Sequence, residues 1–411
     1  MFHQSNSVEL TKCLACGSDD LTSTLDLGNQ PLANSYKDTK TEIQESYPLA
    51  INRCTNCYHV QLTHAVNPDL MYKNYLYVSG TSYTMRNHFQ WFADYACETY
   101  FSHNFDIPKN VMDIGCNDGS QLNEFKNFDL VTFGIDPAQN LVHMSRLNGH
   151  KVEAEFLNPI YALRNDFRYD IIVAQNVFTH NHDPETFMYC VKKMMNENSL
   201  FFIQTSQADM ILNNEFDTIY HEHISFYNIN SMRELCQRTG MFLLDVIKCP
   251  LHGNSYIFVI SKNSSTSRPS NIQNKIEMER KAGLLTDNTY IDYESKCKNV
   301  LDDFRKVVNT NQGKYKLVGY GAAAKGMTLL NASGIQLDYI IDDNVLKHNK
   351  FTPGSSIEIC SSDRLKTEER LILFIPLAWN FFDEIKTKIK SIRNNNQDKF
   401  CTYFPRVEIS S

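Results

Sequence analysis

Long hydrophobic runs are missing from this 411-residue chain. No uninterrupted apolar stretch approaches the roughly 20 residues that a membrane-spanning helix needs. The first residues, MFHQSNSVELTKC, lack the basic start and the apolar stretch of a secretory leader. The sequence therefore predicts a cytosolic protein without a membrane partner.

Excess positive charge is also missing. The chain has 40 Lys and Arg against 47 Asp and Glu, so its net charge is −7. A protein that holds nucleic acid neutralises phosphates with clustered Lys and Arg, so this balance argues against a nucleic-acid partner. Glycine (16) and proline (12) are scarce, and hydrophobic residues make up 42% of the chain. This composition excludes a collagenous or disordered chain, and the length predicts two or three globular domains.

Twelve cysteines are too few for a disulfide scaffold in a chain of this length. Four of them form two Cys-x-x-Cys pairs. Each pair can present two thiolates to one tetrahedral ion, so together they predict a closed structural zinc site. A redox motif would need only one pair. The predicted ligands are Cys13, Cys16, Cys54 and Cys57.

Neighbouring histidines leave an alternative ligand set open. His59 or His64 could replace one sulfur ligand, although both are more simply core or surface residues. A site with four protein ligands has no open coordination position, so this zinc would not take part in catalysis. The eight other cysteines are scattered singly and are expected to be small buried hydrophobic residues.

The pattern divides the chain into three regions. Residues 1–70 carry the Cys pairs and the turn-rich segment DLGNQPLANSY (26–36), which predicts a small metal-stabilised module. Residues 71–264 alternate strand-like and helical runs, which is typical of βαβ units and a parallel sheet. After a Ser-rich linker at 261–271, residues 265–411 repeat that alternation. The predicted class is α/β, with two doubly wound domains after the small module.

Nine strands are expected in the two larger regions. They are NVMDIG (110–115), VTFGID (131–136), YDIIVAQNV (169–177), SLFFIQT (199–205), FLLDVI (242–247), SYIFVI (255–260), KLVGYG (316–321), LDYIIDD (337–343) and RLILFIPLAW (370–379).

A glycine-containing turn, DIGCNDGS (113–120), follows the first of these strands. Its glycines let the backbone come close to a ligand at the start of a helix. The next strand ends in Asp136, where an acidic side chain can accept both hydroxyls of a ribose. Asp113 and Asp118 would repel a pyrophosphate but not a cationic ligand, and a plain tight turn is the alternative. The combination resembles the cofactor motif of S-adenosylmethionine (SAM) methyltransferases. The candidate contacts are Asp113, Gly115, Asn117, Gly119, Ser120, Asp136, Gln175 and Asn176.

The segment DTIYHEH (217–223) gathers two His, one Glu and one Tyr after the strand at 199–205. Strand ends of an open α/β sheet line the ligand crevice, so this cluster is well placed for acid–base chemistry. The His-Glu-x-x-His spacing of a zinc protease is absent, which argues against a catalytic metal. Any single histidine there is equally explained as a hydrogen-bonded structural residue. Further candidates for the crevice are His180 and the aromatic-polar residues Tyr75, Tyr77 and Ser79, although a Tyr-rich stretch is also typical of a domain interface.

The segment GYGAAAKG (319–326) ends one strand and opens a helix, and the next strand ends in Asp342 and Asp343. This pattern fits a nucleotide-binding turn. Glycine and alanine are equally expected where a helix packs closely on a strand, so both interpretations stay open.

Taken in order, the Cys pairs, DLGNQPLANSY, DIGCNDGS, YHEHISFY and GYGAAAKG resemble the SAM-dependent sugar C-methyltransferases of deoxysugar biosynthesis, over essentially the whole chain. The resemblance implies a zinc-binding N-terminal domain (1–70), a SAM-binding middle domain (71–264) and a Rossmann-like C-terminal domain (265–411). It implies as substrate a nucleotide-linked 4-keto-6-deoxysugar, methylated at C-3 beside the ketone. It does not define the oligomeric state.

The resemblance also implies roles for particular residues. His223 would be the general base, with Tyr220 and Glu222 around the sugar. His180 would assist near the ketone oxygen, and Tyr77 (or Tyr75) would close the pocket. The chain departs from the family at LHGNS (251–255), where Asn254 replaces a glycine, and this puts the pocket shape in doubt.

The chemistry fits these residues independently. Carbon is a poor nucleophile, so its methylation needs an adjacent carbonyl, a base for the α-proton and donors for the developing oxyanion, which a His, Tyr and Glu cluster supplies. Two rivals stay open. One is an O- or N-methyltransferase of another small molecule, and the other is a non-catalytic sugar-nucleotide-binding protein.

Overall fold

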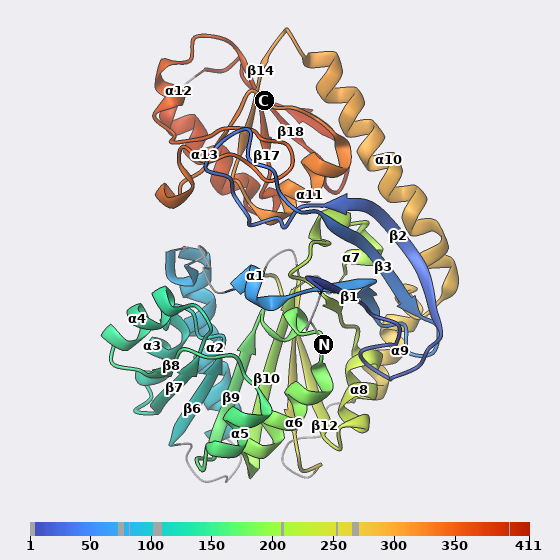
Figure 1. Ribbon diagram of the computed structural model, residues 1–411, viewed down its shortest axis with the longest axis vertical. Coiled ribbons are helices and arrows are strands. Elements are labelled where there is room, and N and C mark those ends of the chain that lie inside the picture. Colours follow the sequence, from blue (N-terminus) through green and yellow to red (C-terminus); the bar gives the residue numbers. More distant parts are fainter. Residues whose placement is uncertain are drawn as a thin grey trace.

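The computed structural model describes residues 5–72, 78–81, 83–101, 109–206, 209–251, 254–264, 271–393 and 395–411. A seven-stranded and a six-stranded sheet lie at opposite ends of the molecule, and the N-terminal strands lie between them (Figure 1). In the described part of the chain, no helix has both the length and the apolar character needed to cross a membrane.

The N-terminal module contains two small antiparallel sheets. Its four-stranded sheet has the order β11-β4-β3-β2, and β11 comes from a segment more than 150 residues further along the chain. The second sheet pairs β1 with β5. Their bounds are β1 Ser7–Glu9, β2 Leu21–Gln30, β3 Tyr47–Cys54, β4 Val60–Leu62, β5 His64–Val66 and β11 Ser225–Phe226. The strand β11 therefore ties the segment at 217–223 to the module that carries the Cys pairs.

The seven-stranded sheet has the order β12-β13-β10-β9-β6-β7-β8. The strands from β10 to β8 are parallel, and the chain runs outward in both directions from β6, as in a doubly wound fold. The strands are β6 Asn110–Ile114, β7 Val131–Ile135, β8 Lys151–Glu153, β9 Tyr169–Gln175, β10 Met195–Ser206, β12 Phe242–Cys249 and β13 Ser255–Ser261.

The expectation of an all-parallel sheet is wrong at one edge. The strand β13 is antiparallel to both β10 and β12. Only residues 250–254 connect β12 to β13, and a parallel crossover needs a dozen residues or more, so the two strands form a hairpin.

Helices cover this sheet and begin at recognisable caps. Asn158 accepts the amide hydrogen of Tyr161 and is followed by Pro159, and Asp183 caps Thr186 ahead of Pro184 in the same way. The helices up to this point in the chain are α1 Pro68–Tyr72, α2 Tyr83–Phe101, α3 Ser120–Lys126, α4 Gln139–Leu147, α5 Pro159–Arg164, α6 Pro184–Met194, α7 Met210–Asn213 and α8 Ile229–Arg238, with 3-10 turns η1 Ser79–Thr81, η2 Phe178–His180 and η3 Phe216–Thr218.

The six-stranded sheet has the order β16-β15-β14-β17-β18-β19 and is parallel except for its last strand. The chain again starts in the middle, at β14, and winds both ways. Its elements are β14 Lys316–Tyr320, β15 Tyr339–Ile341, β16 Ile359–Cys360, β17 Ile372–Pro376, β18 Lys399–Thr402, β19 Glu408–Ser410, α11 Ala324–Ser333, α12 Arg364–Thr367 and α13 Phe382–Ile392, with η4 Val345–Lys347 and η5 Trp379–Phe381.

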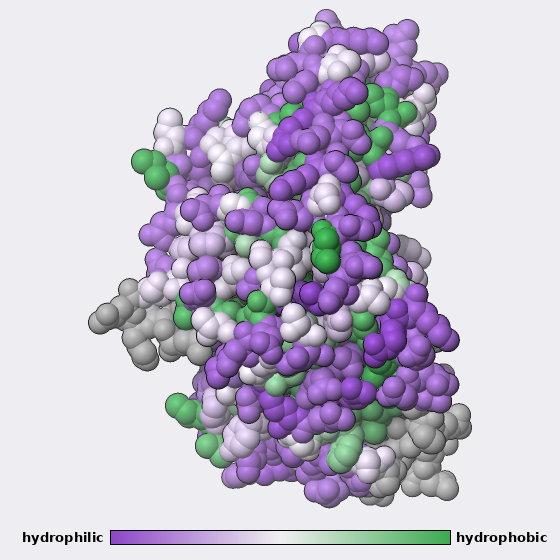
Figure 2. Space-filling view, turned by 90° about the vertical axis from the view of Figure 1, so that its right-hand side faces the viewer, coloured by the Kyte–Doolittle hydropathy of each residue, from purple (hydrophilic) through white to green (hydrophobic). Residues whose placement is uncertain are grey.

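Two helices, α9 Ile272–Ala282 and α10 Asp287–Asn311, connect the two large sheets. The long helix α10 runs along one side of the molecule beside β2 (Figure 1). Its buried Tyr293, Cys297 and Phe304 share one hydrophobic core with the N-terminal module and the six-stranded sheet. The face that carries α10 is mostly hydrophilic, with isolated apolar residues (Figure 2).

The α/β class with two doubly wound sheets and a small N-terminal module is confirmed, and every expected strand is present. The strands of the N-terminal module and the short β8, β16, β18 and β19 were not expected. The domain boundaries at 70 and 264 stay a prediction.

Candidate active site and zinc centre

A cavity of about 1260 Å³ lies where the carboxyl ends of the two large sheets meet the N-terminal module. It is lined by Asp113 near the end of β6, Asn176 after β9, Gly321 after β14 and Asn34 of the N-terminal module. Single small-molecule sites are typically roughly 300–1,000 Å³, so this cavity has room for two ligands side by side.

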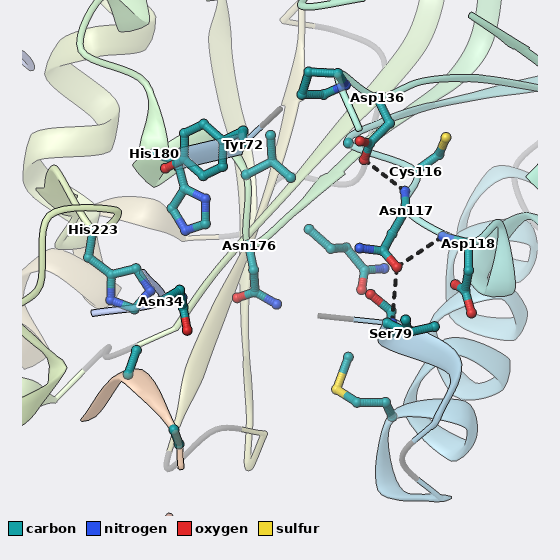
Figure 3. Close-up of a pocket in the computed structure, with 18 of the residues that line it drawn as sticks. Asn34, Tyr72, Ser79, Cys116, Asn117, Asp118, Asp136, Asn176, His180 and His223 are labelled. Carbon is teal, nitrogen blue, oxygen red and sulfur yellow. Dashed lines mark hydrogen bonds between the residues drawn. The ribbon is translucent and has the colours of Figure 1, made fainter. Parts of the chain in front are cut away.

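One side of the cavity is built by the turn after β6. Asp136 accepts the amide hydrogens of Asn117 and Ala138 through its two oxygens, at 3.0 and 2.8 Å. Asn117 has a left-handed backbone (φ 51°), and its side-chain oxygen accepts the amide hydrogen of Ser79 at 3.0 Å (Figure 3). These bonds fix the turn against the segment that precedes α2.

Three carboxylates crowd this side of the cavity. Burial, together with the charges of Asp136 and Asp118, holds the pKa of Asp113 well above its usual range. Burial also raises the pKa of Asp136. A cationic ligand would relieve this repulsion, whereas an anionic one would add to it.

Two unsatisfied acceptors lie at the carboxyl end of β9. The side-chain oxygens of Gln175 and Asn176 are buried without a hydrogen-bond partner in the described structure, although Gln175 does donate to Gln121 at 2.8 Å. Buried polar atoms are normally paired, so both oxygens are suited to a donor on a ligand. Figure 3 places Asn176 between the carboxylate side of the cavity and its histidine side.

His223 and Tyr220 form a hydrogen-bonded pair on the opposite side. Nδ1 of His223 is 2.9 Å from the carbonyl oxygen of Thr218, which can only accept, so Nδ1 carries the hydrogen. Nε2 of the neutral ring is therefore the basic nitrogen, and it accepts the Tyr220 hydroxyl hydrogen at 2.6 Å. This geometry presents an oriented base to the cavity.

His180 stacks between two aromatic neighbours. Its ring lies 5.3 Å from that of His223 and 5.8 Å from that of Tyr72. Burial lowers the pKa of His180 to about 4, so the ring is neutral near pH 7. Its Nε2 is buried without a hydrogen-bond partner among the described residues, so it is available to a ligand.

The other residues of the 217–223 segment do not line the cavity. Glu222 is buried behind Asn34, whose side-chain amide donates to its carboxylate at 2.5 Å. His221 faces the carbonyl oxygen of Tyr47, and burial lowers its pKa to about 4, as expected for a structural histidine. The sequence predicted that the segment at 217–223 stands at the end of the strand now identified as β10. In the structure, β10 ends at Ser206, and the segment is held instead by the pairing of β11 with β4.

Several predicted residues lie apart from the cavity. A side chain at Gly119 would collide with Ser145, so this glycine serves packing against α4, and Ser120 donates to Asp118. Asn254 donates to Asp209 and does not line the cavity. Tyr75 and Tyr77 are outside the described residues.

The turn after β14 repeats the first turn. Asp342 accepts the amide hydrogen of Ala322 at 2.6 Å, as Asp136 does for Asn117. A side chain at Gly319 would collide with Ile340, and one at Gly326 with Leu377, so these two glycines are explained by close packing. Lys325 lines the cavity, and its buried ammonium lies 4.5 Å from the centre of the Trp379 ring without a described hydrogen-bond partner.

The four paired cysteines form a compact cluster. Their sulfur atoms all lie within 4.8 Å of one another, with two pairs at 3.6 Å. Zinc–sulfur bonds of about 2.3 Å in a tetrahedron put neighbouring sulfurs roughly 3.8 Å apart, so the cluster fits zinc. His59 bonds Ser225 and His64 bonds Thr63, so neither belongs to the cluster. Within the described ranges, no second group of three or more His, Cys, Asp or Glu side chains comes close enough to hold a metal.

The remaining cysteines are mostly core residues, as expected. Seven of the eight are buried, and Cys360 is half-buried beside Arg364.

The sequence interpretation missed several cavity residues. Asn34 and Tyr36 belong to a turn-rich loop with no chemical signal of its own, and their position depends on contacts with distant segments. Glu155 and Phe156 follow the short strand β8, and the rule that ligands gather at strand ends would have found them if β8 had been recognised.

Three family models match successive parts of the chain. They describe a zinc binding domain (residues 13–72), a methyltransferase domain (93–245) and a C-methyltransferase C-terminal domain (250–405). The curated protein C-methyltransferase NovU of Streptomyces niveus is 26% identical over 415 residues, which cover 98% of this chain and 97% of that one.

Solved methyltransferases overlap only part of the chain. A SAM-dependent methyltransferase from Clostridium acetobutylicum is 12% identical with a TM-score of 0.36, covering 45% of this chain and 93% of that one. Magnesium protoporphyrin IX methyltransferase from Synechocystis, with bound SAM, is 12% identical with a TM-score of 0.34, covering 44% and 81%.

The match to a zinc binding domain agrees with the four-cysteine cluster. The matches to methyltransferase models and to the full-length relative agree with a cavity that has a carboxylate side and a histidine side. SAM and zinc are thus the expected cofactors. The chain is therefore a SAM-dependent methyltransferase, and it matches in order the models of a zinc binding domain, a methyltransferase domain and a C-methyltransferase C-terminal domain.

Proposed function

We propose that this enzyme methylates C-3 of a nucleotide-linked 4-keto-6-deoxysugar. The observation that carries the proposal is the orientation of His223, whose unprotonated Nε2 faces the same cavity as the carboxylates after β6 and β7. The likeness of the YHEHISFY and DLGNQPLANSY segments to sugar C-methyltransferases supports the substrate class.

The cofactor would bind on the carboxylate side. We assign Asp136 to the ribose hydroxyls, and Asp113 with the unpaired oxygens of Gln175 and Asn176 to the ammonium and sulfonium end. Gly115 and Asn117 would let the backbone pass close to the ligand, because both adopt positive φ. Gly119 and Ser120 were predicted as cofactor contacts, and we now assign them to shaping the turn.

The reaction begins with the α-proton of the sugar. The Tyr220 hydroxyl turns from Nε2 of His223 towards the ketone oxygen, Nε2 takes the proton from C-3, and the C–H electron pair moves into the ketone to give an enolate. A ring N–H of neutral His180 and the Tyr220 hydroxyl are the donors nearest to the developing oxyanion. SAM held by Asp136, Asp113 and Asn176 would supply an electrophilic methyl group, which the enolate carbon would take with its electron pair while the sulfur kept the electrons of the C–S bond. His223 then releases its proton to solvent.

The nucleotide portion would bind at the turn after β14. The ammonium of Lys325 is buried without a described hydrogen-bond partner at the N-terminus of α11, a helix whose first turn has no side-chain cap. Lys347 and Lys388 also line this part of the cavity. A pyrophosphate would satisfy both the unpaired ammonium and the free amide hydrogens.

A mass-spectrometric screen of SAM with nucleotide-linked 4-keto-6-deoxysugars tests the proposal directly. We expect one product heavier by a single methyl group. Incubation of substrate in D₂O without SAM should exchange the α-proton, and His223→Ala should abolish this exchange while SAM still binds. An O- or N-methyltransferase would add a methyl without exchange, and a binding protein would do neither.

A further inference from the structure

Asn34 lies in the cavity although it belongs to the N-terminal module. The loop after β2 carries it to the histidine side, where Figure 3 shows it next to His223. It is half-buried, and Tyr36 of the same loop also lines the cavity.

The bond from Asn34 to Glu222 fixes the orientation of the amide. A carboxylate only accepts hydrogen bonds, so the atom 2.5 Å from Glu222 must be the NH₂ group of Asn34. The carbonyl oxygen, Oδ1, is thereby turned away from the carboxylate, and its described contact is a long one of 3.4 Å to the Tyr36 hydroxyl.

The loop is fastened on its other side as well. The Tyr36 hydroxyl donates to the carbonyl oxygen of Ala322 at 2.6 Å, and the Lys347 ammonium binds the same oxygen at 2.7 Å. Lys347 also lies 5.0 Å from the centre of the Tyr36 ring. Asn34 is therefore held between the segment at 217–223 and the turn after β14.

We propose that Oδ1 of Asn34 accepts a hydroxyl hydrogen of the sugar, and that Glu222 is the residue that positions Asn34. This inference rests on the sugar substrate proposed above. An amide that donates to a carboxylate becomes a better acceptor at its oxygen, because hydrogen bonds in a chain polarise one another. A neutral acceptor at the cavity wall also keeps the Glu222 charge out of contact with the forming enolate, which a bare carboxylate would destabilise.

An exchange of partners tests the positioning role. Asn34→Asp places two carboxylates against each other, and we expect kcat/KM for the sugar to fall at least 100-fold. The double variant Asn34→Asp with Glu222→Gln restores an amide–carboxylate bond in the reverse sense, so KM should recover at least tenfold, whereas kcat should stay low because the carboxylate at position 34 faces the forming enolate. The control is Asn127→Asp, which alters an amide–carboxylate bond to Glu124 on the surface of α3 and should have no effect.

A truncated substrate tests the contact itself. Asn34→Ala should lower kcat/KM on the hydroxylated sugar at least tenfold, and should cause no loss on the monodeoxy analogue that lacks the recognised hydroxyl. SAM affinity, measured by calorimetry, should be unchanged. Equal losses on every sugar, or no rescue by the double variant, would overturn this inference. Turnover by the wild-type enzyme in the same assays would still support the proposed function. Failure of the wild type to methylate any sugar would overturn both.

Discussion

Nε2 of His223 accepts the hydroxyl hydrogen of Tyr220 at 2.6 Å, and the rings of the two residues lie 3.9 Å apart. The bond between Nδ1 and Thr218 holds the ring independently, because it uses the other nitrogen. The Thr218 bond can therefore hold His223 in place when the Tyr220 hydroxyl is removed, so the two roles can be tested separately.

Tyr220→Phe should keep the base and lose the donor. We expect α-proton exchange in D₂O to fall about 100- to 1,000-fold, as for the loss of one donor to an oxyanion, yet to stay faster than in His223→Ala. NMR of the exchanged substrate gives both rates. Exchange in Tyr220→Phe as slow as in His223→Ala would contradict this separation.

Binding of SAM should depend on pH through Asp113. Its raised pKa keeps the carboxyl protonated in the free enzyme at pH values where an exposed carboxyl is ionised. A bound cation favours the ionised form, so binding releases a proton and affinity should fall as pH decreases through that raised pKa. Calorimetry in buffers of different ionisation enthalpy counts the protons.

Asp113→Asn provides the comparison. It should weaken SAM binding roughly tenfold or more at neutral pH, the loss of one charge-assisted hydrogen bond, and remove most of the proton release. Asp166→Asn, at an exposed site of the same domain, should change neither quantity. Proton release that persists in Asp113→Asn would assign the effect to another group.

Loss of zinc should reduce proton abstraction more strongly than it reduces cofactor binding. Cys54 and Cys57 close the turn between β3 and β4, and β4 pairs with β11 directly after His223. The cofactor side is built on β6, β7 and β9 of a different sheet. Cys57→Ala, with its reduced zinc content measured, should therefore lower α-proton exchange at least tenfold more than it lowers SAM affinity. Cys360→Ala is the matched control, because Cys360 is outside the cluster. Parallel loss of both properties would indicate general unfolding.

The sequence predicted the two large sheets and the histidine side because local patterns encode them. Alternating apolar runs give β6 and β9, and the dense YHEH cluster identifies His223. Asn34 could not be predicted, because its partner Glu222 is 188 residues away and only the folded chain brings them together. Lys325 belongs to the GYGAAAKG segment that the sequence analysis identified. The burial of its ammonium against Trp379 depends on tertiary packing, which the sequence pattern does not encode. The hairpin of β12 and β13 was readable from its short connection.

Buried neutral histidines should destabilise the fold in acid. The folded-state pKa of His221 is about 4, below that of an exposed histidine, so the unfolded chain binds the proton first and this stability is lost as pH falls from about 6.5 towards 4. The raised pKa values of Asp217 (about 6) and Glu279 (about 7) make the fold more stable as pH falls, which opposes the effect of His221. A variant of His221 is therefore needed to isolate its contribution.

His221→Gln should therefore cost less stability at pH 5 than at pH 7, by about 2 kcal/mol in the free energy of unfolding. Urea denaturation at the two pH values measures the difference. His143→Gln, at an exposed site on α4, is the control. An equal cost of His221→Gln at both pH values would refute the assignment.

Lys325 should determine affinity for the nucleotide and not for SAM. Its ammonium is buried without a described hydrogen-bond partner, and its charge favours the ionised form of the buried Asp217, so it can still donate hydrogen bonds to an anionic ligand. Loss of a charge-assisted bond is worth about 1.5–3 kcal/mol, so Lys325→Ala should raise KM for the sugar nucleotide roughly 10- to 100-fold and leave SAM affinity unchanged. Lys314→Ala, at an exposed site, should leave KM unchanged. A variant that is less stable and has an unchanged KM would make Lys325 a structural residue.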